Sequence, residues 1–404
     1  MWWWALLLLV LVGGSETAQR FLDWARNNGL QSEMVSWPVS PLWVVCSTNT
    51  AQTEFARAGR GVSARQDIFP GQVFLSVPLS LCLSNETYRN TPLEAITRQL
   101  DMARGTAYVL LREHSLGNNS FWKPYIDLLP TTFHSLGQWS VKDLRHLQDD
   151  DFFLTKQREE RRWEWYEYRD LKERLRKELL PRWFTFKTYL WATAVVTTRC
   201  FDLNSTLRHT LVPFADLFNH DETSGTRWGL SNAQGQVLMY SYDIIPHQTQ
   251  VYNNYGGDMS NLRSLTNYGF VKPHNQFNSE ELRVNGTEKA GKLFALLNVM
   301  KTIQLFARLA KPDGGGVWAT CVAVLNAELL TKPTTILEDQ TLLLSTASVI
   351  GERQRIAITY RLERKLMMAK HRDFCQRALT CLVRKPDSVW LTNLRLYLRL
   401  VGMR

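Results

Sequence analysis

The sequence predicts an α+β fold, in which a β-rich part with a helical insert is followed by an all-helical part. Short apolar or alternating runs bounded by proline and glycine predict strands at 73–78, 81–83, 237–242 and 250–253. Residues 149–182, and the chain from about 288 onward, have helical periodicity instead. Strands first and helices last indicate two structural units.

The N-terminal residues contain an apolar run from Trp2 to Val12, followed by small residues. A run of this length is too short to cross a bilayer as a helix. It is typical of the apolar core of a secretory signal, although no basic residue precedes it. We therefore expect residues 1–18 to be a signal peptide or an uncleaved anchor, with membrane contact only if the segment is retained. The secretory pathway or endoplasmic reticulum is the expected compartment, with cytoplasm or nucleus as the alternative.

Three further segments predict helices. Residues 19–30 form an amphipathic pattern that ends at Gly29. Residues 92–116 and 184–200 also have apolar residues at helical spacing. The segment from Asp149 to Arg182 is rich in charges of both signs, which indicates an exposed helix with internal ion pairs.

Cysteines and sequons leave several questions open. The six cysteines show no CxxC pair and no spacing typical of zinc, so disulfides stay open and a structural zinc site is not expected. N-glycosylation sequons begin at Asn85, Asn118, Asn204 and Asn285. About three such triplets arise by chance in a chain of this composition, so their number decides nothing.

The basic charge is concentrated near the C-terminus. The net charge is +10, and residues 351–404 hold 13 basic and four acidic residues. A solvated face of a helical domain explains this excess. Nucleic-acid binding needs basic residues interleaved with stacking aromatics, and this segment is mostly leucine, arginine and valine, so no nucleic-acid partner is expected.

Three short islands carry residue types suited to a binding site. Gly59-Arg60-Gly61 lets the backbone approach a ligand closely. Asp216, Asn219 and His220 follow an apolar run and offer donors and acceptors together. Tyrosines flank glycine-rich backbone in the third island, at Tyr252, Tyr255 and Tyr268-Gly269-Phe270. Each island alone fits a turn, a helix end or core tyrosines equally well.

The same residues bear on two other kinds of site. No activated serine or cysteine beside a base is visible, so nothing predicts a nucleophilic triad. Asp221 and Glu222 follow His220, and on the residues alone they leave a metal site open.

Five elements, in order, resemble the SET-domain methyltransferases, in the branch that includes the Rubisco large-subunit lysine methyltransferase and the actin-histidine methyltransferase. The resemblance extends from about residue 19 to the C-terminus. The matching segments are Gly59-Arg60-Gly61-Val62 with Ile68-Phe69-Pro70-Gly71, residues 121–130 (FWKPYIDLLP), Trp191-Ala192 through Thr198-Arg199, residues 216–220 (DLFNH), and Tyr255-Gly256 through Ser260-Asn261 to Tyr268-Gly269-Phe270.

This resemblance implies a fold and a domain order. Residues 19–284 correspond to a SET core of short sheets with a knot-like crossing, divided by a helical insert at about 131–190. Residues 285–404 correspond to the helical domain on which a protein substrate docks, and the expected state is a monomer. Zinc-binding cysteine clusters of histone-type relatives are absent, which fits docking through helices.

The resemblance also implies site roles, with S-adenosyl-L-methionine as cofactor and no metal. Tyr268 corresponds to the catalytic tyrosine and Tyr255 to a wall of the lysine channel. Arg199 corresponds to the residue that reaches the carboxylate end of the cofactor. The other implied cofactor contacts are Ala58, Gly59 and Arg60 along the cofactor, Asp216, Asn219 and His220 at its methionine and adenine parts, and Gly269 and Phe270.

The implied activity is methyl transfer to a lysine amine of a non-histone protein. A lysine must lose its proton before it can attack, and an apolar aromatic channel favours the neutral amine by desolvation. Tyr268 favours lysine over histidine, because the histidine-methylating relative lacks this tyrosine. Ala58 stands where many relatives carry an acidic residue, which predicts weaker cofactor binding. A protein-histidine methyltransferase and an inactive SET-derived binding module are the alternatives.

Overall fold

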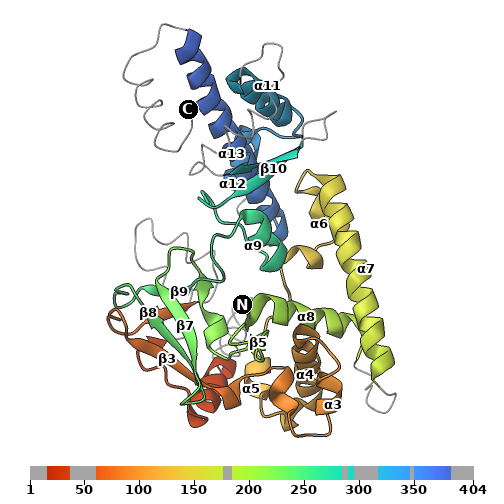
Figure 1. Cartoon of the computed structure of the whole chain (residues 1–404), viewed down its shortest axis with the longest axis vertical. Helices are drawn as coiled ribbons and strands as arrows, with labels where there is room; N and C mark the ends of the chain where they lie inside the picture. The colour runs from red at the N-terminus through yellow and green to blue at the C-terminus, as the bar shows by residue number, and fades with distance from the viewer. Residues whose placement is uncertain are drawn as a thin grey trace, which may run out of the picture. The chain divides into compact units, whose positions relative to one another are not determined.

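The computed structural model describes residues 16–36, 61–175, 184–283, 290–294, 317–345 and 350–383. Contacts between Cα atoms divide the chain into two compact units (Figure 1). Unit 1 comprises residues 1–133 and 160–258, and unit 2 comprises residues 134–159 and 259–404. The domain limits expected from the motifs differ from these units and stay a prediction. Residues 1–15 of the expected signal peptide, and Ala58, Gly59, Arg60 and Asn285, lie outside the described residues.

Unit 1 is built on small sheets. One has the strand order β1 (Val35–Ser36), β2 (Val62–Ala64), β9 (Gln250–Asn253) and β6 (Asn219–His220). Strand β9 pairs antiparallel with β2 and parallel with β6. The other described strands of unit 1 are β3 (Val73–Pro78), β8 (Gln236–Ser241) and β7 (Thr226–Ser231) in one antiparallel sheet, and the pair β4 (Cys200–Phe201) and β5 (Thr210–Leu211). The predicted strands at 73–78, 237–242 and 250–253 are therefore confirmed. The predicted strand at 81–83 was wrong, because Leu79–Leu81 is a 3-10 helix and Leu83 forms an isolated bridge with Leu211.

Helices of unit 1 pack beside these sheets (Figure 1). Residues 16–27 are helical, and Gly29 with a φ of +93° ends the turn as expected. Helix α8 (Phe186–Arg199) begins at a capping box formed by Thr185 and Thr188. Further helical segments of unit 1 are η3 (Asn85–Tyr88), α3 (Glu94–Thr97), α4 (Met102–Leu116), η4 (Gly117–Asn119), α5 (Lys123–Ile126) and η7 (Ala215–Leu217).

The prediction of one helix over 92–116 was wrong, because the segment forms α3 and α4 with a break between them. Asp101 lies at this break in an extended conformation, and its carboxylate accepts a hydrogen bond from the Arg104 amide at 2.9 Å. Such N-capping satisfies an amide that the first helical turn leaves unpaired. The apolar periodicity continues across the break, so it could not reveal where one helix ends.

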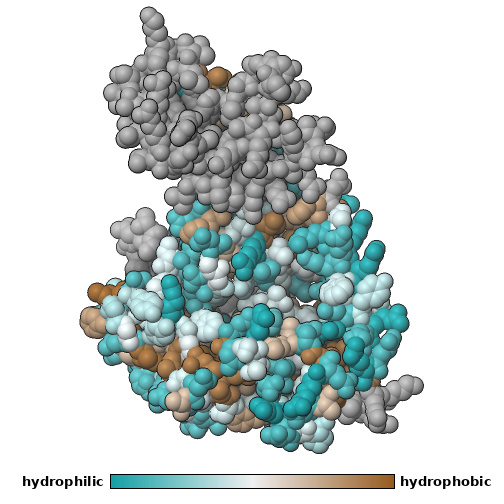
Figure 2. Space-filling view, in the orientation of Figure 1, coloured by the Kyte–Doolittle hydropathy of each residue, from teal (hydrophilic) through white to brown (hydrophobic). Residues whose placement is uncertain are grey.

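A single apolar cluster forms the core of unit 1 and joins residues from its sheets and helices. Its fully buried large side chains include Phe21, Tyr125, Tyr189, Phe214 and Phe218. On the face drawn in Figure 2, hydrophilic residues dominate the described surface and hydrophobic residues lie in scattered patches. No helix in the described part of the chain is long and apolar enough to cross a membrane.

Unit 2 is mainly helical. Its described helices are α6 (Val141–Arg145), the first part of α7 (Asp150–Arg174), α9 (Asn261–Asn267), α11 (Val317–Leu330), α12 (Ile336–Ser345) and α13 (Glu352–Val383). The expectation of helix from about 288 onward was wrong at its start, because β11 (Ala290–Phe294) pairs antiparallel with β10 (Ser279–Arg283). This strand pair precedes α11, α12 and α13. The α+β class and the helical C-terminal part are confirmed.

A disulfide links α11 to α13. Cys321 and Cys375 are both buried, and they are separated by 54 residues in sequence. A bond that closes a loop of this length contributes typically about 2–4 kcal/mol to stability by restricting the unfolded chain. Disulfides persist in oxidising compartments such as the lumen of the endoplasmic reticulum.

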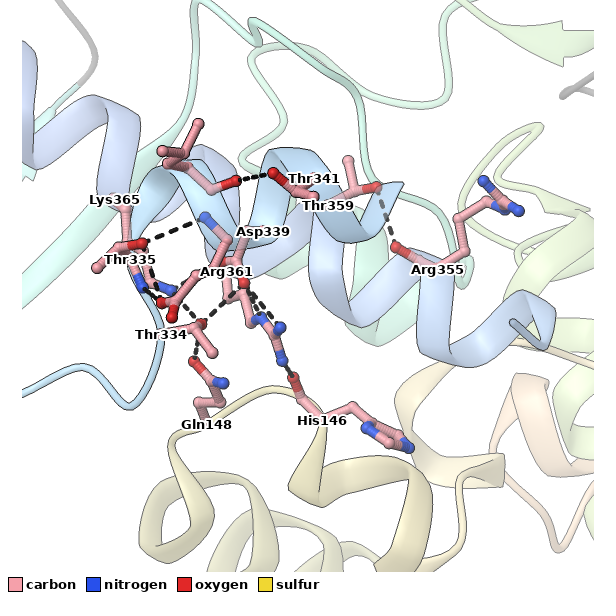
Figure 3. Close-up of polar contacts among 12 residues, drawn as sticks. His146, Gln148, Thr334, Thr335, Asp339, Thr341, Arg355, Thr359, Arg361 and Lys365 are labelled. Atoms are coloured by element: carbon pink, nitrogen blue, oxygen red, sulfur yellow. Dashed lines mark hydrogen bonds and ion pairs between the residues drawn. The ribbon is translucent and has the colours of Figure 1, made fainter. Parts of the chain in front are cut away.

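A buried polar cluster holds α13 against α12 and the segment before α7 (Figure 3). The Asp339 carboxylate accepts hydrogen bonds from Arg361 Nη2 at 2.7 Å and from Lys365 Nζ at 2.7 Å. Arg361 also donates to the His146 carbonyl at 2.8 Å, and Thr334 joins Gln148 to the same carboxylate. Burial lowers the pKa of Lys365, and the Asp339 carboxylate counteracts this. The cluster therefore depends on one carboxylate that pairs with two buried cations.

Candidate functional site

Strand β9 brings two of the three sequence islands into one sheet of unit 1. Asn219 lies opposite Tyr252 and His220 opposite Asn253 in the parallel β6–β9 pair. On the other side of β9, Val62 lies opposite Val251, which places Gly61 at the start of the neighbouring strand. Residues separated by about 190 positions are thus neighbours, as the resemblance implied for a cofactor site.

His220 is fixed by two partners. Its Nδ1 accepts a hydrogen bond from the Tyr255 amide at 3.1 Å, so the ring proton lies on Nε2. Nε2 lies 3.8 Å from a carboxylate oxygen of Glu222, and both side chains are buried. The Tyr255 hydroxyl donates to the Phe218 carbonyl at 2.6 Å, and the Tyr255 and His220 rings lie 5.1 Å apart. Tyr255 therefore holds the Asn219–His220 segment in place.

A second polar group joins two more of the matching segments to the segment 216–220. The Asp216 carboxylate on η7 accepts a hydrogen bond from the Tyr125 hydroxyl at 2.9 Å. Arg199, the last residue of α8, donates through Nη1 to the Asp216 carbonyl at 3.0 Å and to its Oδ2 at 3.1 Å. The segments that contain Tyr125, Arg199 and Asp216 consequently meet at one carboxylate.

Burial raises the pKa of the Asp216 carboxyl, whereas the Arg199 guanidinium and the Tyr125 hydroxyl stabilise its ionised form. The Asp216 side chain is fully buried, and the Arg199 side chain is 25% exposed. Asp216 Oδ1 is buried and has no hydrogen-bond partner among the described residues. A buried carboxylate oxygen that lacks a donor is costly, and a ligand donor can satisfy it.

Gln250 and Asn253 present further buried acceptors along β9. Both polar atoms of the Gln250 side chain, and Oδ1 of Asn253, have no hydrogen-bond partner in the part of the chain that the structure describes. Asp216 Oδ1, Gln250 Oε1 and Asn253 Oδ1 are each an acceptor that an amino group of a ligand can satisfy, whereas Gln250 Nε2 is a donor. The residues present therefore fit a cofactor that carries such groups.

Gly61 is the glycine that this site requires. A Cβ at this position would overlap the Gln250 amide and lie 2.9 Å from Asn219 Nδ2. Because Gln250 is buried, its side chain has little room to move away. The absence of a side chain at residue 61 lets β2, β6 and β9 approach one another.

We expect Gly61→Ala to lower the free energy of unfolding of unit 1 by about 1–3 kcal/mol, the usual cost of overpacking a filled site. Gly229→Ala in β7 is the matched control, because nothing lies within 4 Å of the Cβ that it adds. Urea denaturation of both variants checks this. Equal midpoints for the two variants would contradict the account of Gly61.

Unit 2 contains the remaining predicted residues. Tyr268 follows α9, and its amide donates to the Ser264 carbonyl at 2.9 Å. Gly269 has a φ of +83°, and a Cβ there would overlap the backbone of His134 and Ser135. The Tyr268 and Phe270 rings lie 6.1 Å apart. How Tyr268 is placed toward the cofactor residues of unit 1 stays a prediction.

Asn261 organises the loop that contains Tyr268. Its side chain is fully buried, donates to the Lys272 carbonyl at 3.0 Å and accepts from the Lys272 amide at 3.2 Å. Asn275 also donates to Asn261 Oδ1 at 3.0 Å, and Asn278 accepts from the Asn261 amide at 3.1 Å. These bonds tie the two ends of the Tyr268-Gly269-Phe270 segment together.

Sequence reasoning missed the individual roles of several of these residues. Tyr125 and Asn261 lie within segments that match the family. The sequence therefore pointed to these segments, but it did not predict the contacts that the two side chains make. Gln250 and Asn253 stand in no motif that could have singled them out, and Glu222 was noted only as a possible metal ligand. Among the described residues, no group of three or more His, Cys, Asp or Glu side chains could hold a metal ion.

The comparisons define the class of fold first. The chain matches a solved structure entitled "Crystal structure of the SET domain of LSMT bound to Lysine and AdoHcy" with a TM-score of 0.65, covering 94% of this chain and 99% of that chain at 19% identity. A structure of "Rubisco LSMT bound to AdoMet" matches with a TM-score of 0.63, 20% identity, and coverage of 91% and 93%. The chain therefore has the fold of a SET-domain protein.

Particular relatives then agree with the predicted branch. The chain is 25% identical over 255 residues to the chloroplastic Rubisco large-subunit N-methyltransferase of Nicotiana tabacum, with 58% of this chain and 52% of that protein covered. It is 26% identical over 285 residues to the chloroplastic fructose-bisphosphate aldolase-lysine N-methyltransferase of Arabidopsis thaliana, with 67% and 55% covered. The human actin-histidine N-methyltransferase is 26% identical over 259 residues, with 60% and 42% covered.

The chain spans about half the length of these curated relatives. No family model matches it. The resemblance to SET-domain methyltransferases of the Rubisco methyltransferase-like branch is confirmed by the relatives and by the shared fold.

Proposed function

We propose that the protein is an S-adenosyl-L-methionine-dependent protein-lysine N-methyltransferase that acts on a non-histone protein. The observation that carries this proposal is the meeting of Gly61, Asn219, His220 and the Arg199–Asp216 pair from separate segments of unit 1. Relatives whose names state N-methylation of the Rubisco large subunit and lysine N-methylation of aldolase support the same reaction.

S-adenosyl-L-methionine, when bound, supplies an electrophilic methyl group on a sulfonium. Asp216 Oδ1, Gln250 Oε1 and Asn253 Oδ1 are the acceptors that amino groups of the cofactor would satisfy, because these buried oxygens have no partner among the described residues. The Arg199 Nη1 is occupied by Asp216, so we assign only the rest of its guanidinium to the cofactor carboxylate. Asn219 and His220 hold the adenine end through β6, and Ala58, Gly59 and Arg60 are assigned by resemblance alone.

The second substrate is a lysine that must reach the methyl group as a neutral amine. Tyr268 orients this amine through its hydroxyl, and Phe270 contributes apolar surface that favours the uncharged form by desolvation. Tyr255 lines the lysine channel with its ring, since its hydroxyl is bound by the Phe218 carbonyl. The tyrosine at residue 268 favours lysine over histidine as acceptor.

The protein substrate docks on the helices of the C-terminal part, and the protein acts as a monomer. The relatives that name a protein substrate support docking of a protein. The disulfide between α11 and α13 gives this docking part a fixed scaffold.

We place the protein in the secretory pathway. The apolar run Trp2–Val12 has the composition of a secretory signal, whereas transit peptides are rich in Ser and Arg, of which this run has neither. The disulfide Cys321–Cys375 supports an oxidising compartment.

Calorimetric titration of the full chain with S-adenosyl-L-methionine tests the proposal. We expect one site per chain, and we expect Asp216→Asn to weaken binding by roughly tenfold, which corresponds to about 1.4 kcal/mol. Asp202→Asn is the matched control, because this carboxylate is exposed in the β4–β5 loop of the same unit. Absence of binding at millimolar cofactor would favour an inactive binding module.

A further inference from the structure

The sequon at Asn204 has a geometry that the other described sequons lack. It lies in the loop between β4 and β5, and Asn204, Ser205 and Thr206 are all exposed. Leu203 and Leu207 close the loop through a backbone hydrogen bond of 2.9 Å. Asp202 accepts a hydrogen bond from the His209 amide at 2.9 Å, which fixes the base of the loop. Asn204 therefore stands in a defined turn at the surface.

The two essential side chains of this sequon are already joined. Asn204 Oδ1 accepts hydrogen bonds from the Thr206 amide at 2.8 Å, the Thr206 hydroxyl at 3.0 Å and the Leu207 amide at 2.7 Å. Asn204 Nδ2 donates no hydrogen bond within the residues that the structure describes. The amide nitrogen is thus accessible, and the hydroxyl two residues later polarises the same amide.

Asn85 and Asn118 differ in this respect. Asn85 is half-buried, its Nδ2 donates to Glu86 at 3.4 Å, and a Cβ on Gly105 would lie 2.7 Å from its own Cβ. Asn118 is exposed, but Ser120 is buried and its hydroxyl donates to Glu113 at 2.6 Å. Only the sequon at Asn204 combines an exposed asparagine with an exposed hydroxyl among the three that the structure describes.

We propose that Asn204 is a site of N-linked glycosylation. The inference depends on the secretory compartment proposed above, which the apolar run Trp2–Val12 and the disulfide Cys321–Cys375 support independently. N-linked glycans occupy surface loops of secreted proteins, and the β4–β5 loop is such a loop. Methyl transfer does not depend on this glycan, because Asn204 belongs to none of the site residues.

The modification is a group transfer with a named co-reactant, a lipid-linked oligosaccharide diphosphate used by the transferase of that compartment. Asn204 Nδ2 forms a bond to the anomeric carbon of the first sugar. The bond from that carbon to the phosphate oxygen breaks, and the lipid diphosphate leaves with its electron pair. Nδ2 loses one proton to a base of the transferase, so atoms and charges balance.

The test is expression of the full chain, with its own N-terminal segment, in secretion-competent eukaryotic cells. Intact mass is measured before and after treatment with an amidase that removes N-linked glycans. We expect the wild-type mass to fall after treatment, and the Asn204→Gln variant to lack the corresponding glycan. Thr206→Ala removes the same glycan and Thr206→Ser retains it, because serine keeps the hydroxyl.

Asn85→Gln is the matched control, and it keeps the wild-type number of glycans. An unchanged wild-type mass after amidase treatment would overturn the proposal, as would an equal number of glycans in wild type and Asn204→Gln. Cofactor titration of the Asn204→Gln variant separates this result from the proposed methyltransferase function, since we expect unchanged affinity.

Discussion

The Tyr268→Phe variant is expected to lose methyl transfer by on the order of 10²-fold, the usual cost of removing one preorganised hydrogen-bonding group. The hydroxyl is the only group that this change removes, so the apolar surface of the ring is kept. We expect cofactor affinity to stay at the wild-type value, because the Tyr268 hydroxyl is assigned to the lysine amine and not to the cofactor. Initial rates of transfer of a labelled methyl group into extract proteins measure the effect.

Tyr166→Phe is the matched control, because this tyrosine on α7 is 58% exposed. Its rate of methyl transfer is expected to equal that of the wild type. A Tyr268→Phe variant with wild-type turnover would show that the phenol does not orient the amine.

The Asp339→Ala variant is expected to lose about 3–5 kcal/mol of stability in unit 2, since it leaves buried cations without their partner. Arg361 and Lys365 are both buried, and Figure 3 shows both directed at this carboxylate. Without it, the burial that lowers the pKa of Lys365 is no longer opposed by this partner, and we expect the pKa of the amine to fall further. Hydrogen exchange of the α13 amides, together with urea denaturation, measures the loss.

Asp373→Ala is the control on the same helix. Asp373 forms an ion pair with the neighbouring Arg372, and both side chains are substantially exposed. Pairs of this kind contribute about 0–1 kcal/mol. A loss of stability in Asp339→Ala no larger than in Asp373→Ala would mean that the cluster in Figure 3 does not hold α13 in place.

Local sequence pattern predicted much of unit 1. Apolar alternation between turn residues located β3, β8 and β9, and helical spacing located α8. The same signals could not divide α3 from α4, because the break at Asp101 is decided by a cap and not by a change of periodicity. They also missed β11, whose strand conformation comes from pairing with β10.

The candidate site was predictable to the extent that it depends on motifs. The neighbourhood of Asn219, His220 and Gly61 was expected from the order of the islands, and the parallel β6–β9 pair provides it. Contacts between distant residues outside these motifs were not expected. The Cys321–Cys375 disulfide joins residues 54 positions apart, and the Asp339 cluster joins residues up to about 220 positions apart, so only tertiary packing brings them together.

Amino-acid analysis of proteins labelled by the full chain with methyl-tritiated S-adenosyl-L-methionine tests the central claim most directly. The account predicts that radioactivity is recovered as methylated lysine after acid hydrolysis and that the Gly61→Ala variant labels less. Radioactivity recovered only as methylhistidine, or no label above a reaction without enzyme, would contradict it.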